Sequence, residues 1–95
     1  MSEAPRVEVL DRASRAALFD ARAAWLRARD QPNADTVRAA FRQCVLAARL
    51  ARQTADSDPE TSGWWADNAT RIATVAKQLR AQLVRIVEGP RSAAG

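Results

Sequence analysis

The residues best suited to chemistry lie in the acidic stretch 56–67, where oxygen-bearing side chains are spaced as in a calcium-binding loop. They are Asp56, Asp58, Glu60, Ser62 and Asp67. A calcium loop of this kind needs a glycine at its sixth position and a bidentate glutamate at its twelfth. Here Thr61 stands at the sixth position and an aspartate at the twelfth. We therefore expect no metal site, and we expect these acids to cap helix ends instead.

Side chains for acid–base or nucleophilic catalysis are scarce. The chain has no histidine and no tyrosine, which excludes histidine-based proton transfer, Ser-His-Asp and Cys-His nucleophiles and histidine-ligated zinc. The single cysteine, Cys44, allows no internal disulfide, and its place on an apolar helix face predicts an inert core residue. The chain also lacks a glycine-rich phosphate loop and a catalytic carboxylate pair. The sequence therefore predicts no enzyme, no cofactor and no small-molecule substrate.

Arginine dominates the charged residues, with 14 Arg against one Lys and a net charge of +4. Four arginines share one face of a predicted helix, within roughly 80° of each other. They are Arg38, Arg42, Arg49 and Arg52. Such a stripe could follow a nucleic-acid backbone, because guanidinium groups bind phosphate oxygens bidentately. The alternative is a solvated basic face that reflects composition, and no aromatic residue lies within the stripe for base stacking.

Two large apolar residues, Phe19 and Leu26, lie one heptad apart on the first predicted helix and away from its apolar seam. Arg15 and Arg22 flank them. Large apolar side chains bordered by arginine are typical of a protein interface with its polar rim. The alternative is that both pack on the N-terminal segment or on another helix of the same chain. These four residues are our main candidates for partner binding.

Trp64 is a fifth candidate for partner binding. It is adjacent to Trp65, so the two side chains point about 100° apart on a helix. Trp65 falls on the apolar seam of the third predicted helix, which places Trp64 at the edge of the fold. An edge tryptophan can anchor a partner, or it can close the open end of a helical bundle.

Apolar residues repeat in alternating steps of three and four along three segments, which predicts helices with almost no strand signal. On the first segment the predicted apolar seam includes Ser14, Ala17, Ala21, Ala24 and Ala28, and Leu18 and Trp25 widen the same face; on the third it includes Trp65, Ile72 and Leu79. We place them at about 7–30, 34–55 and 59–88, with Ser62 as the alternative start of the third and a disordered tail over 89–95 after Gly89-Pro90. Asn33 and Asp58 are the expected N-caps. Such heptad-like seams with short connections favour antiparallel neighbours. We expect one all-α domain over 1–95, an up-down-up three-helix bundle.

The seams of the first two predicted helices consist mostly of alanine, which buries little area. Such a core stabilises weakly, and self-association or docking on a larger protein would supply the missing burial. No apolar run approaches the roughly 20 residues that cross a bilayer, and residues 1–6 do not resemble a signal peptide, so we expect a cytoplasmic protein. The sequence predicts a small non-catalytic interaction, adaptor or regulatory module with a protein partner or as a homo-oligomer. A small basic nucleic-acid-binding protein is the alternative.

Overall fold

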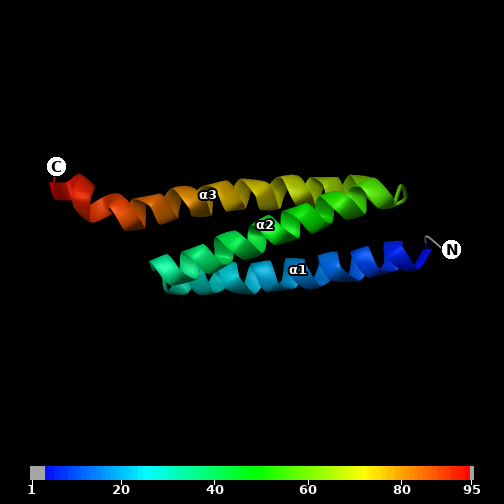
Figure 1. The fold of residues 1–95 in the computed structure, drawn as a ribbon, viewed down its shortest axis with the longest axis horizontal. Coiled ribbons are helices and arrows are strands. Elements are labelled where there is room, and N and C mark those ends of the chain that lie inside the picture. The colour runs from blue at the N-terminus through cyan, green and yellow to red at the C-terminus, as the bar shows by residue number, and fades with distance from the viewer. Residues whose placement is uncertain (1–3, 95) are drawn as a thin grey trace.

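The protein is a long assembly of three α-helices in a computed structural model, which describes the backbone of residues 4–94 and the side chains of residues 7–89. The helices are α1 (Ala4–Asp30), α2 (Ala34–Ser57) and α3 (Ser62–Ala94). They share one long direction, and the molecule measures 60 × 20 × 18 Å (Figure 1). The N-terminal end of α1 and the α2–α3 turn lie at one end of this rod. The described residues are thus all-helical and packed as expected for a helical bundle.

The α1–α2 turn is short, and a capping box holds the start of α2. The side-chain oxygen of Asn33 accepts a hydrogen bond from the backbone N–H of Thr36 at 3.0 Å. In return, the Thr36 hydroxyl oxygen accepts one from the Asn33 backbone N–H at 3.1 Å. Asp35 lies in the first turn, where its negative charge interacts favourably with the positive end of the helix dipole. The predicted cap and the predicted start of this helix are confirmed.

The α2–α3 turn differs from the main prediction for this stretch. Asp58 does not start a helix at residue 59, because it is the C-cap residue of α2. Its carboxylate accepts hydrogen bonds from the Glu60 backbone N–H at 3.2 Å and the Thr61 hydroxyl at 2.8 Å. The acid therefore stabilises a turn, and α3 begins at Ser62, the alternative start.

The outer ends of α1 and α3 extend further than predicted. α1 begins at Ala4 and not near residue 7, and α3 continues past Glu88 to Ala94. The expected helix stop at Gly89-Pro90 is therefore wrong, whereas the expected disorder of the tail stays a prediction; Gly95 lies outside the described residues. No glycine of the described chain has a positive φ, so Gly89 does not form the left-handed cap that ends many helices. A proline removes only one backbone donor, and a helix can continue past it with a bend.

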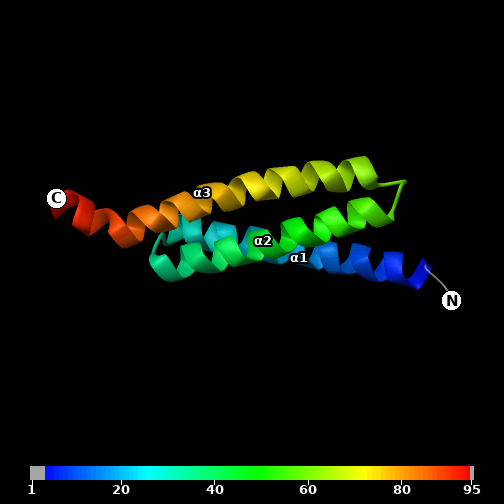
Figure 2. The same ribbon diagram turned by 45° about the horizontal axis from the view of Figure 1, so that its top comes forward.

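α2 is the central helix, because it packs on both others. No Cα atom of α1 lies within 8 Å of a Cα atom of α3 in the described part of the chain. The predicted seam of α1 is buried from Ser14 to Ala28. Ten of the fourteen apolar residues buried in the described chain are alanines; the larger ones include Trp65, Val37 and Leu79. α3 also extends beyond the α1–α2 turn (Figure 2). Val84 and Val87, in the C-terminal half of α3, are exposed.

Candidate functional site

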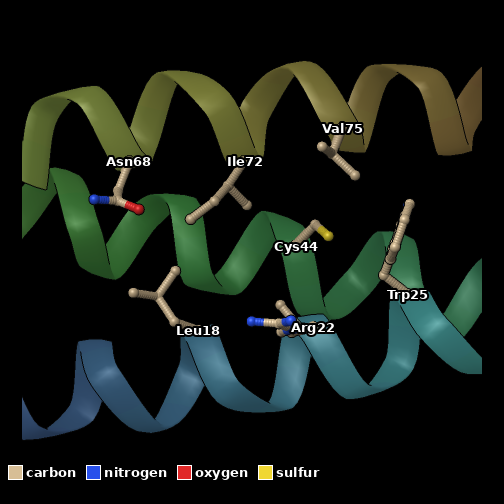
Figure 3. A pocket seen from close by; sticks show the side chains of 8 residues that line it. Leu18, Arg22, Trp25, Cys44, Asn68, Ile72 and Val75 are labelled. Atoms are coloured by element: carbon tan, nitrogen blue, oxygen red, sulfur yellow. The ribbon is translucent and has the colours of Figure 1, made fainter.

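A groove between α1 and α3 forms a concave, mostly apolar surface in the described part of the chain. It exists because both helices pack on α2 without their backbones meeting. Its hollow has a volume of about 430 Å³. Leu18 and Trp25 project into it from α1, and Ile72 and Val75 project from α3 (Figure 3). The walls are therefore large apolar side chains that face one another across a gap.

Small residues form the floor of the groove, which gives it depth. Ala21 of α1 is 5% exposed and Cys44 of α2 is 3% exposed. Burial raises the pKa of the Cys44 thiol above its ordinary value, because the thiolate would lose its hydration. The group stays protonated at neutral pH, as expected for an inert core cysteine, and it offers no nucleophile to the groove.

Arg22 connects the groove with the outer face of α1 that the sequence singled out. It lines the groove, three residues after Phe19 and four before Leu26. Phe19 is 77% exposed, so it does not pack on another described part of the chain. Leu26 is half-buried. The structure thus leaves Phe19 free for a partner, and it provides a larger apolar surface beside it.

Trp64 and Arg15 form a cluster at the end of the groove near the α2–α3 turn. Trp64 is 51% exposed and meets the buried Trp65 edge to face, with ring centres 4.7 Å apart. The Arg15 guanidinium lies 5.7 Å from the ring centre of each tryptophan. Asp11 holds the same arginine through an ion pair of 2.8 Å. Arg15 therefore joins α1 to α3 here, and one side of Trp64 stays open to solvent.

The four arginines predicted on α2 lie on its outer side. Arg42, Arg49 and Arg52 are exposed, whereas Arg38 is half-buried and lies 3.6 Å from the Asp35 carboxylate. Cations of α3 extend this surface, because Arg49, Lys77 and Arg80 line one hollow of about 270 Å³. The α2 arginine stripe is therefore part of a wider basic face that spans two helices.

Sequence reasoning missed the groove, although it named most of the residues around it. Leu18, Trp25 and Ile72 all fit the apolar seams, so periodicity assigned them to the core. Trp25 is 37% exposed, and Leu18 and Ile72 are half-buried. The available signal was the offset of Leu18 and Trp25 from the alanine seam by about 60–80°. That offset indicates a second apolar face only when the neighbouring helices are known.

Metal-ligating side chains do not gather in the described structure. No group of three or more Asp, Glu or Cys residues that could hold a metal ion occurs within the residues it describes. Of the acids with the calcium-like spacing, Asp58 accepts a hydrogen bond from the Thr61 hydroxyl in the α2–α3 turn. Within the same residues, no helix is long and apolar enough to cross a membrane.

Comparison of the chain with protein-family models, with curated proteins and with solved structures found no match. The functional proposal therefore depends on the geometry of the groove and of the basic face of α2 and α3.

Proposed function

We propose that this chain is a small non-catalytic interaction module, an adaptor or regulatory protein built as an up-down-up three-helix bundle. The observation that carries the proposal is the groove lined by apolar side chains of α1 and α3 over a floor of small residues. Apolar grooves between helices are a recurring way to bind a partner helix. The exposed Phe19 and Trp64 beside it add the large side chains that dominate binding energy in interfaces.

The alanine-rich core gives a second reason to expect a partner. Each buried alanine removes little apolar area from water, so three helices packed in this way gain little from burial. A partner that covers Trp25, Ile72 and Phe19 would add large apolar areas. A partner that binds only the folded chain would also raise the apparent stability of the chain.

The test is site-specific photo-cross-linking in cells. A benzoylphenylalanine replaces Asn68, which lines the groove, or Phe19, on the adjoining outer face of α1, and Leu46, which is 48% exposed on α2, is the control position. We expect one protein to be captured from positions 19 and 68 and not from 46. Once purified, it should bind the wild-type chain and lose about tenfold or more in affinity for Trp25→Ser. Equal capture from all three positions would contradict the proposal, as would none from the groove side.

Self-association is the other form of this proposal, and the outer face of α1 is its expected contact. Sedimentation equilibrium of the wild type should show an oligomer, and the double variant Phe19→Asp with Leu26→Asp should be monomeric. Circular dichroism should show unchanged helicity for the double variant. A monomeric wild type removes self-association and leaves docking on another protein. Unfolding of the variant would assign the two residues to the core.

A nucleic-acid partner is the second candidate, and the cations of α3 beside the α2 arginine stripe favour it. Arg49, Lys77 and Arg80 share one hollow, so phosphates could be bound from two helices. Fluorescence anisotropy of labelled DNA and RNA should then show binding that weakens steeply as salt rises. Arg38→Ala and Arg49→Ala should weaken it for every sequence. Binding that ignores salt or survives these substitutions would remove the candidate.

A further inference from the structure

We propose that the groove between α1 and α3 binds an acidic amphipathic helix of a different protein. The inference rests on the proposed function and adds to it the chemistry of the partner. The shape of the groove argues for a helix. Leu18 and Trp25 are separated by two helical turns, about 10 Å along α1, and Ile72 and Val75 face them. An incoming helix with apolar residues at positions i, i+3, i+4 and i+7 presents anchors at the same spacing.

The edges of the groove carry arginines, and this charge argues for an acidic occupant. On α1, Arg22 lines the groove, and Arg15 and Arg29 lie one turn from Leu18 and Trp25. Arg29 also lies 5.4 Å from the ring centre of Trp25.

On α3, the exposed Arg71 lies one turn from both Asn68 and Val75, which line the groove. Three acids lie near these cations, all toward the ends of the groove. Asp11 is ion-paired with Arg15, Asp30 lies 4.0 Å from the Arg29 guanidinium, and Asp67 lies one turn before Arg71. Asp20 points about 200° around the helix from Arg22. None of the ion pairs among the described residues involves Arg22 or Arg71. The middle of the groove is therefore apolar inside and positive along both edges.

The same charges argue against a second copy of this chain in the groove. Each of the three helices contains more Arg and Lys than Asp and Glu. A helix of a second copy would bring further cations beside Arg22 and Arg71, and like charges brought together across an interface cost affinity. An acidic helix would instead form charge-assisted hydrogen bonds with the guanidinium groups along both edges.

The test uses three labelled synthetic helical peptides and the full-length chain, with binding followed by fluorescence anisotropy at low and at physiological salt. The first peptide has Leu and Ile at the anchor positions and Glu at its exposed positions. The second has the same anchors with Lys, and the third keeps Glu but has Ala at the anchors. We expect the first to bind, and the other two to bind about tenfold or more weakly.

Two charge-reversal variants locate the binding site. Arg22→Glu with Arg71→Glu changes the edges of the groove, whereas Arg42→Glu with Arg49→Glu makes the same change of net charge on the outer side of α2. The first pair should weaken binding of the acidic peptide about tenfold or more, and the control pair should weaken it far less. The bound peptide should also slow alkylation of Cys44, because this thiol forms part of the groove floor.

Several outcomes would overturn the inference. One is failure of the acidic peptide to bind, and another is equal weakening by both variants, which would indicate surface electrostatics alone. Equal binding of the peptide without anchors would show that the apolar walls are not used. Displacement by an RNA oligonucleotide that depends on Arg22 and Arg71 would indicate a polyanion site. A neutral or basic partner cross-linked to the groove would overturn this inference while supporting the proposed function.

Discussion

The thiol of Cys44, at the floor of the groove, links the burial of one residue to the pH dependence of the free energy of unfolding. Because burial raises the pKa of Cys44 above its ordinary 9.0, the folded thiol keeps its proton at a pH where the unfolded thiol has lost it. The folded state then binds more protons, so the free energy of unfolding falls as pH rises above about 9. Urea titrations of the wild type at pH 8 and above 9 should show this loss.

The control for that measurement is Cys44→Ala, which keeps a small apolar residue at the same place. Other groups titrate in the same range, so the difference between the two proteins is the quantity to compare. We expect the wild type to lose stability relative to the variant as pH rises. A constant difference would mean that the thiolate is as well hydrated in the folded state as in the unfolded one.

One pair of buried hydroxyls joins α1 to α2. The oxygens of Ser14 and Thr54 lie 2.6 Å apart, and both residues are fully buried. The Thr54 hydroxyl also lies 2.9 Å from the Leu50 carbonyl oxygen. Its single proton can therefore go to Leu50, while Ser14 donates to Thr54. Removing one partner leaves a buried polar group without its hydrogen bond, which costs about 1–3 kcal/mol, whereas removing both avoids part of this cost.

A double-mutant cycle with Ser14→Ala and Thr54→Val checks this pairing. Each single variant should be destabilised, and the double variant should lose about 1 kcal/mol less than the two losses combined. Denaturant titration gives the three values. Strict additivity would show that each hydroxyl is satisfied independently, for example by a backbone carbonyl of its own helix.

Among the features that stabilise single helices, the capping box at the start of α2 is the clearest. Asn33→Ala removes the acceptor for the Thr36 backbone N–H, one of the donors that no helical carbonyl can satisfy. We expect a loss of about 1 kcal/mol and a lower Tm. Asn33→Asp is the matched control, because it keeps an acceptor oxygen and should be close to neutral. A neutral alanine variant would mean that water caps the helix as well as the side chain does.

Some helix boundaries could be predicted from the sequence, and others could not. The start of α2 was predictable because Asn33 and Thr36 act locally, three residues apart. The start of α3 was not, since Asp58 could cap a following helix or stabilise a turn, and only the position of α2 decides between them. The Gly89-Pro90 pair is a strong stop signal, yet a glycine with negative φ does not end a helix.

The candidate site depends on packing between distant segments, which periodicity alone does not describe. The alternating steps of three and four residues correctly placed the α1 seam between Ser14 and Ala28 in the core. Those residues face α2, so their burial does not depend on the position of α3. Whether Leu18, Trp25 and Ile72 face protein or solvent depends on how closely α1 approaches α3. The sequence could therefore predict the exposed candidate Phe19 more readily than the groove beside it.

α1 and α3 each pack on α2 without their described backbones meeting, so each can open separately. We expect α1 to open first. Between Ser14 and Ala28, α1 buries one serine and four alanines against its neighbours. α3 instead contributes the fully buried Trp65 as well as Leu79. Since burial of small side chains gains little free energy, the α1–α2 contact should be weaker than the α2–α3 contact. Local opening of α1 would then cost less than global unfolding.

Hydrogen–deuterium exchange followed by mass spectrometry tests this order of stability. Peptides from the middle of α1, around Ala17–Ala28, should exchange faster than peptides from the middle of α2 or from the first half of α3. A ligand in the groove contacts α1 and α3 together, so it should slow exchange in α1 most. Trp65→Phe, placed in the α2–α3 contact, should speed exchange in α3 and leave the ranking of α1 and α2 unchanged. Uniform exchange of the three helices would mean that the molecule opens as one unit, with the alanine contacts as strong as those of Trp65.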